Sequence, residues 1–164
     1  MPLNGKLIPK NEKAPDTASN APAVDTQGAS NRQPRRHTIP TATARLPRIP
    51  GSANTARRFA ADFLASSGAA GMVVEDVVLL VSEVVSNAIE HTDGAGAVQL
   101  DLRLDGAVLH VAVSDDSVQL PELQNRDGKA HRGRGLQLVE MLADEWGVRV
   151  RPDGKTVWFE LTVA

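Results

Sequence analysis

The chain contains no cysteine among its 164 residues. This absence excludes a disulfide framework, a thiol nucleophile and a zinc site with cysteine ligands. The sequence also lacks an uninterrupted apolar run of about 18 residues, the length that a membrane-spanning helix requires. Its first twenty residues hold no apolar core of signal-peptide length. We therefore expect a cytoplasmic protein with no membrane segment.

Positive charge is scarce in the larger part of the chain. Residues 1–50 contain eight Lys/Arg and three Asp/Glu, a net charge of 8 − 3 = +5, whereas residues 51–164 contain ten and seventeen, a net charge of 10 − 17 = −7. An acidic domain disfavours direct, sequence-specific binding of nucleic acid. Residues 1–40 also lack periodic hydrophobicity and are rich in Asn, Pro, Ala, Ser and Thr. We predict a disordered basic tail over 1–40 and one domain over 41–164.

The remaining hydrophobic pattern alternates between the periods of strands and helices. An irregular stretch over 114–132 is long for a connection inside a compact domain, which favours a functional lid. The elements predict an α+β fold, a two-layer sandwich of one mixed, mostly antiparallel sheet with helices on one face. The predicted strands cover 41–46, 97–104, 107–113, 148–151 and 156–163, and the predicted helices cover 53–66, 73–91 and 134–146.

Three polar residues follow one another at a spacing of four in the central predicted helix: Glu83, Asn87 and His91. Residues four apart lie above one another on one helix face. Glu83 lies just outside the apolar half of this helix, and Asn87 and His91 lie on its rim. Polar groups at the edge of a core are costly to desolvate unless something binds them. The stripe is therefore a candidate site. Taken alone, Glu83 also fits a solvated residue, Asn87 a satisfied polar residue at the core rim, and His91 a residue that stabilises the helix dipole.

Two further clusters have the chemistry of ligand-binding groups. Asp115 ends an apolar strand, where a carboxylate can accept hydrogen bonds from a ligand amine, and Asp116 and Ser117 follow it. Gly133 and Gly135 flank the start of the last predicted helix, where backbone N–H groups and the helix dipole favour an anion. Asp115 as a turn former, or the glycines as plain loop residues, are ordinary alternatives. Together with the helix stripe, the clusters indicate a nucleotide site.

The order and separation of these clusters resemble the Bergerat-type ATP-binding fold, the histidine kinase-like ATPase fold. The matching elements are Glu-x-x-x-Asn at 83–87, Asp-x-Ser at 115–117 and Gly-x-Gly-Leu at 133–136. The strings SEVVSNAIEH and GRGLQLVEMLADEWGV are similar to the anti-sigma-factor serine kinases and related regulatory ATP-binding proteins of actinobacteria. The resemblance covers roughly residues 41–163.

The resemblance implies ATP and Mg²⁺ as ligands and assigns roles to the matching residues. Asn87 would bind Mg²⁺, and Glu83 would orient or deprotonate the attacking hydroxyl or water. Asp115 would accept from the adenine amino group, within a variant motif that includes Ser117. Phosphate would lie against the Gly-x-Gly-Leu segment, with added positive charge from its arginine or from a lysine of the predicted lid; these residues are Gly133, Arg134, Gly135, Leu136 and Lys129. His91 matches a frequent family position without an assigned role.

Two features separate the chain from the better-known members of the fold. The family's second motif is usually Asp-x-Gly, whereas here Ser117 stands in the place of the glycine and Asp116 adds a second carboxylate. The chain also has no helical hairpin with a phosphoacceptor histidine and no transducer domain, so it would act on or bind a separate protein.

The resemblance predicts a serine/threonine protein kinase of anti-sigma-factor type. Its protein partners would be an anti-anti-sigma antagonist, a sigma factor or both, and family members often form homodimers. The departure at 116–117 supports an alternative, a nucleotide-sensing binding module without catalysis. A non-nucleotide α+β scaffold is the third reading, supported only by how ordinary each cluster is alone.

Overall fold

A computed structural model of the chain describes residues 38–69, 71–90, 96–118 and 134–163. The chain divides into two units, Met1–Thr38 and Ile39–Ala164, and the described residues belong almost entirely to the second. The predicted tail over 1–40 therefore lies, apart from its last three residues, outside the described residues. Most of the predicted irregular stretch, 114–132, also lies outside them.

The described residues form three helices and five strands. The second and longest helix, α2, carries the predicted polar stripe and extends over most of the range that its periodicity predicts. None of the helices in the described ranges is long and apolar enough to cross a membrane. The bounds in chain order are β1 (Thr41–Leu46), α1 (Ser52–Ser66), α2 (Met72–Glu90), β2 (Val98–Asp105), β3 (Val108–Asp115), α3 (Arg134–Leu142), β4 (Glu145–Arg151) and β5 (Gly154–Thr162).

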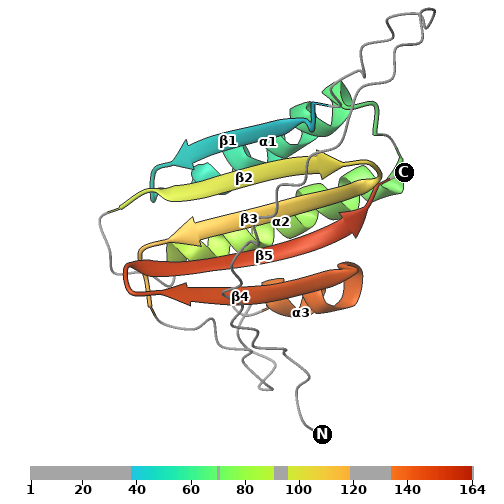
Figure 1. Ribbon diagram of the computed structural model, residues 1–164. Coiled ribbons are helices and arrows are strands. Elements are labelled where there is room, and N and C mark those ends of the chain that lie inside the picture. The colour runs from blue at the N-terminus through green and yellow to red at the C-terminus, as the bar shows by residue number, and fades with distance from the viewer. Residues whose placement is uncertain (1–37, 70, 91–95, 119–133, 164) are drawn as a thin grey trace, which may run out of the picture. The chain divides into compact units, whose positions relative to one another are not determined.

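The strands form one sheet in the order β1-β2-β3-β5-β4. All four pairings between the described strands are antiparallel, so the parallel part of the mixed sheet that the sequence predicted is not found. Figure 1 shows α1, α2 and α3 on the same face of this sheet. The predicted α+β sandwich with helices on one face is confirmed. Strand β3 lies at the centre, so its carboxyl end is flanked by two strands.

The core lies between the sheet and the helices. Alternate residues of the central strands point toward the helices, as a period of two requires, and α2 buries its apolar face against them. Burying one such side chain contributes about 1.5–3 kcal/mol. The largest fully buried side chains are Phe159, Leu64, Leu80, Leu100, Leu102 and Leu109, with Val77, Val81, Val84, Val85, Val98 and Val111.

The last predicted helix ends earlier than its sequence pattern indicates. It stops at Leu142, and Trp146, which the sequence placed in this helix, belongs to β4. The reason is the bonding of Asp144 to β5. Its N–H donates to the Glu160 carbonyl at 2.9 Å, and its carboxylate accepts from the Thr162 N–H at 2.6 Å and from the Thr162 hydroxyl at 2.8 Å. These bonds place the chain beside β5 before another helical turn can form.

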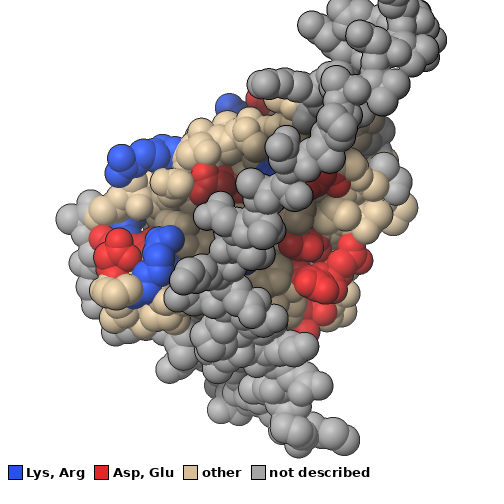
Figure 2. Space-filling view, in the orientation of Figure 1, with Lys and Arg blue, Asp and Glu red and all other residues tan. Residues whose placement is uncertain are grey.

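The face of the sheet turned away from the helices carries polar side chains. Cross-strand pairs form there between Thr43 and Asp101 at 2.6 Å and between Ser114 and Thr156 at 2.8 Å. Acidic and basic groups both occur on this face, as Figure 2 shows outside the area that grey residues cover. Because this face is polar, the helix side of the sheet is the place where a buried ligand group can be held.

Candidate functional site

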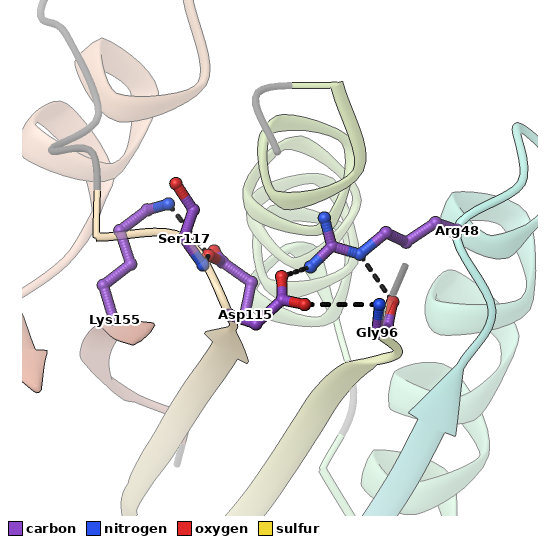
Figure 3. Close-up of polar contacts among 6 residues, drawn as sticks. Arg48, Gly96, Asp115, Ser117 and Lys155 are labelled. Carbon is purple, nitrogen blue, oxygen red and sulfur yellow. Dashed lines mark hydrogen bonds and ion pairs between the residues drawn. The ribbon is translucent and has the colours of Figure 1, made fainter. Parts of the chain in front are cut away.

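The carboxyl end of β3 places a carboxylate inside the protein. The Asp115 side chain is 1% exposed, and it lies on the same side of the sheet as the core residues Val111 and Val113. Its Oδ1 atom accepts a hydrogen bond from the Ser117 N–H at 2.8 Å and another from Lys155 Nζ at 2.9 Å (Figure 3). Its Oδ2 atom is buried and has no partner among the described residues. A buried acceptor without a partner is unusual and costs folding free energy.

The backbone around Asp115 is fixed by close contact with the β4–β5 turn. Gly154 has a φ of +154°, a conformation that residues with a side chain rarely adopt. A Cβ atom at Gly154 would overlap the carbonyl oxygen of Asp115 and approach the Cα of Asp116 to 3.0 Å. Only glycine permits this approach, so the turn and the end of β3 hold each other in position.

The Asp116 side chain contacts segments beside β1 and β2, whereas the Asp115 side chain contacts β5. Its Oδ1 forms an ion pair with Arg48, and its Oδ2 accepts from the Gly96 N–H at 3.2 Å. Arg48 Nε also donates to the Gly96 carbonyl at 2.6 Å. Figure 3 shows Arg48 and Gly96 on one side of Asp115 and Lys155 on the other. The group links the segment after β1, the segment before β2 and the segment after β3.

The start of α3 lies directly against the polar stripe of α2. A Cβ atom at Gly135 would lie 2.7 Å from Nδ2 of Asn87 and 3.1 Å from Cβ of Glu83. Glu83 and Asn87 are both half-buried, as their places on the helix wheel predicted. Gly135 therefore allows the α3 terminus to approach two predicted site residues more closely than any other residue would. Glu83 and Asn87 lie 52 and 48 residues before Gly135 in the sequence, and the fold brings them into contact with it.

The other predicted site residues lie either in the core, beside Asp115 or outside the described part of the chain. Leu136 is 3% exposed and belongs to the core, so any contact of this residue with a ligand would involve its backbone. Ser117 follows β3 and directs its N–H to Asp115. Arg134 is the first residue of α3, and its side chain lies outside what the structure describes. His91, Lys129 and Gly133 lie outside the described residues.

The described residues suit a nucleotide with a bound divalent cation. Asp115 offers a buried acceptor for an amino group, and the start of α3 beside Asn87 is a helix N-terminus, a position that favours phosphate. No group of three or more His, Asp or Glu that could hold a metal occurs within the described ranges. A cation there would depend on the Asn87 carboxamide oxygen together with phosphate oxygens and water, which is a chemistry that Mg²⁺ accepts.

Sequence reasoning missed two residues of this region. Lys155 was not singled out, although it stands in β5 at the parity of the buried residues Val157 and Phe159, where a lysine is unexpected. Arg48 follows a proline in an irregular segment, and nothing in its local sequence indicates that it pairs with Asp116, 68 residues away.

Comparison with protein families gives a match over most of the described domain. The sequence model of the family described as "Histidine kinase-like ATPase domain" matches residues 46–161. The matched range contains Glu83, Asn87, Asp115 and Gly135 and extends from the end of β1 to the end of β5.

Among solved structures, one with a TM-score above 0.5 shows similarity of fold. The crystal structure of the RsbU and RsbW domains of Rv1364c from Mycobacterium tuberculosis is 23% identical, with a TM-score of 0.61 over 76% of this chain and 32% of that chain. The present chain thus spans about a third of the length of that structure. The histidine kinase domain of the blue-light activated histidine kinase from Erythrobacter litoralis EL346 is 32% identical, with a TM-score of 0.43 over 55% of this chain and 44% of that chain.

Proposed function

Because the chain belongs to the histidine kinase-like ATPase domain family, we propose that it binds ATP with Mg²⁺ and regulates a separate protein. The proposed reaction is transfer of the ATP γ-phosphate to a serine or threonine hydroxyl, as in anti-sigma-factor kinases. The fold similarity to a structure that includes an RsbW domain supports this choice. Transcription would be regulated through the phosphorylated partner.

The observation that carries the proposal is the buried Oδ2 atom of Asp115. It is an acceptor without a partner among the described residues, on the helix side of the sheet. An amino group of adenine would supply the missing donor, and binding would remove the cost of the unsatisfied oxygen. Asp115 is already positioned by Ser117, Lys155 and the Gly154 contact, so it requires no rearrangement to accept.

The phosphate and metal end of the proposed site is the contact between α2 and α3. Gly135 lets the start of α3 pack closely against Nδ2 of Asn87, whose carboxamide oxygen is the proposed Mg²⁺ ligand. The contribution of Mg²⁺ would be to neutralise charge on the phosphate oxygens. Backbone N–H groups of the Gly133–Leu136 segment would hold the phosphates, with charge from Arg134 or Lys129.

Glu83 is the proposed catalytic carboxylate. It lies one helical turn before Asn87, and both residues pack against Gly135 at the start of α3. A carboxylate beside the metal ligand can orient the partner's hydroxyl and accept its proton as the phosphate is transferred. Its half-buried position leaves it reachable by a protein substrate.

The partner would be an anti-anti-sigma antagonist, a sigma factor or both, and the active form could be a homodimer. Because ATP is the proposed substrate, we propose that the protein acts in the cytoplasm. The negative net charge of residues 51–164 argues against direct, sequence-specific nucleic acid binding.

The test of this function is a phosphotransfer assay with the full chain, Mg-ATP labelled at the γ-phosphate and candidate antagonist proteins. Glu83→Gln should abolish transfer while ATP affinity changes less than about threefold, because the carboxylate acts on the hydroxyl rather than on the nucleotide. Glu90→Gln, at the exposed end of the same helix, is the matched control and should retain transfer. Full transfer in Glu83→Gln would contradict the assigned role.

A second candidate function, nucleotide sensing without catalysis, is favoured by one observation. Ser117 occupies the position of a glycine in the family's usual motif, and its N–H is directed to Asp115. The other departure has less weight, because Asp116 pairs with Arg48 and Gly96. ATP binding that depends on Asn87, with no transfer to any antagonist and no hydrolysis, would favour the sensing function. No saturable ATP binding would favour the non-nucleotide scaffold.

A further inference from the structure

Lys155 is a buried lysine to which the proposed function gives no contact with the ligand. Its side chain is 4% exposed, and its Nζ lies 2.9 Å from Oδ1 of Asp115, its direct partner in the β3–β5 register. Lysine is almost never fully buried unless it is paired, because its charge is costly to remove from water. The pair places an ammonium group beside the one carboxylate that we propose for recognition of the base.

The arrangement leaves an acceptor and a donor side by side. Oδ1 of Asp115 receives both described hydrogen bonds, from Lys155 and from the Ser117 N–H, and Oδ2 receives none. The lysine ammonium has three N–H bonds. Its one hydrogen bond within the described part of the chain uses a single N–H. Oδ2 thus lacks a donor and Nζ has further N–H bonds, on side chains that β3 and β5 hold next to each other, as Figure 3 shows for Asp115 and Lys155.

An adenine base presents the complementary pair on one edge, an N6 amino donor next to the N1 acceptor. We infer that Lys155 is a base-recognition residue that donates to N1 while Oδ2 of Asp115 accepts from N6. This inference rests on the proposed function, in which ATP is the ligand. It extends that function because it assigns a second, charged contact to the base and explains why a lysine is buried at this position.

A purely structural role does not account for the geometry. A buried ion pair is seldom required for stability, since apolar residues of similar volume replace such pairs at little or no cost. A structural pair would also satisfy both carboxylate oxygens, whereas here both described bonds converge on Oδ1. The bond to Oδ1 keeps the Lys155 ammonium on the same carboxylate whose Oδ2 lacks a donor among the described residues.

The first experiment uses the unmodified full chain and nucleotide analogues. Binding of ATP is compared by calorimetry with 1-deaza-ATP, in which N1 is replaced by C–H, and with the 6-desamino analogue, purine riboside triphosphate. We expect each analogue to bind about tenfold or more weakly than ATP, because each leaves one charged group without its partner. Equal affinities for ATP and 1-deaza-ATP would overturn the role of Lys155 and leave the proposed ATP-binding function intact.

The second experiment repeats the comparison in Lys155→Met, after its folded state has been verified by circular dichroism. The ratio of the affinities for ATP and 1-deaza-ATP should fall to about one, since the donor that reads N1 is gone. Thr156→Val is the control: Thr156 is the next residue of β5, bonds Ser114 on the other face of the sheet and should leave the ratio unchanged. A ratio retained in Lys155→Met would overturn the inference. A wild-type chain that binds neither nucleotide would overturn both this inference and the proposed function.

Discussion

Asp115 and Asp116 are neighbours in the sequence with opposite environments. The Asp115 side chain is 1% exposed and retains an oxygen without a donor in the described structure, whereas the Asp116 side chain is 40% exposed and both of its oxygens are bonded. Asp115 is joined to β5 through Lys155. Asp116 is joined to the segments beside β1 and β2 through Arg48 and Gly96.

The difference indicates a division of roles between the two carboxylates of this motif. A satisfied, exposed carboxylate holds chain segments together and contributes little free energy, because water screens its charge. A buried and incompletely satisfied carboxylate is costly to the fold and is therefore a candidate for ligand binding. The second carboxylate, which from the sequence could have repelled phosphate, instead links the ends of three strands. Four changes test this division, from the largest expected effect to the smallest.

Removing the partner of Asp115 should have the largest effect. Lys155→Met leaves a buried carboxylate without its cation, and breaking such a pair costs about 3–5 kcal/mol of unfolding free energy. Chemical denaturation of the full chain measures this loss. The double change Asp115→Leu with Lys155→Met is the control and should recover most of it, because an apolar pair needs no compensating charge. A loss below about 1 kcal/mol in the single variant would show that Asp115 is hydrated despite its burial.

Displacing the backbone of both aspartates should have the next largest effect. Gly154→Ala introduces a methyl group that overlaps the Asp115 carbonyl, at a φ of +154°. We expect a loss of about 2–3 kcal/mol in unfolding free energy from strain and displacement. Gly106→Ala is the matched control in the β2–β3 turn, since it has a φ of +61° and no atom near its Cβ position. Its loss should be about 1 kcal/mol. Equal losses of unfolding free energy in the two variants would mean that the backbone near Gly154 can shift at little cost.

A third change tests whether the α2–α3 contact belongs to the same ligand site as Asp115. Gly135→Ala places a methyl group 2.7 Å from Nδ2 of Asn87, so Asn87 or α3 must shift. ATP affinity should fall about tenfold, which corresponds to about 1.4 kcal/mol. Gly51→Ala, with nothing near its Cβ position, is the control for an added methyl group. Unchanged ATP affinity in Gly135→Ala would separate this contact from the nucleotide site.

Breaking the bonds of Asp116 should have the smallest effect. Arg48→Met removes the ion pair with Asp116 and the hydrogen bond to the Gly96 carbonyl, and the partly exposed carboxylate regains water. We expect a loss of about 1 kcal/mol or less in unfolding free energy. The loss should shrink further at high salt, where exposed charges are screened. A loss as large as that of Lys155→Met would contradict the distinction between the two carboxylates.

Much of this arrangement could be predicted from local sequence. The period of α2 predicted both the helix and the half-buried places of Glu83 and Asn87, because residues four apart share a face. The apolar pattern before Asp115 predicted that this carboxylate lies at the end of a strand. The family resemblance inferred from these motifs is confirmed by the match over residues 46–161. These features depend on short-range periodicity, which a single sequence displays directly.

The features that sequence reasoning missed depend on long-range contact. The pairing of Lys155 with Asp115 and of Arg48 with Asp116 joins residues 40 and 68 positions apart, and no periodicity encodes such pairs. The predicted helix over 134–146 was too long because the apolar pattern continued past Leu142. Bonds from Asp144 to β5 ended the helix there. Tertiary hydrogen bonds outweighed the local helical preference at this boundary.

We propose that Asp115 faces the nucleotide and that Asp116 does not. The most direct measurement is the calorimetric titration of Mg-ATP into Asp115→Asn and Asp116→Asn. We expect a loss of about tenfold or more in affinity for Asp115→Asn, where an acceptor for the base amino group is weakened, and a change of less than about threefold for Asp116→Asn. Wild-type affinity in a folded Asp115→Asn protein, or an equal loss in both variants, would contradict it.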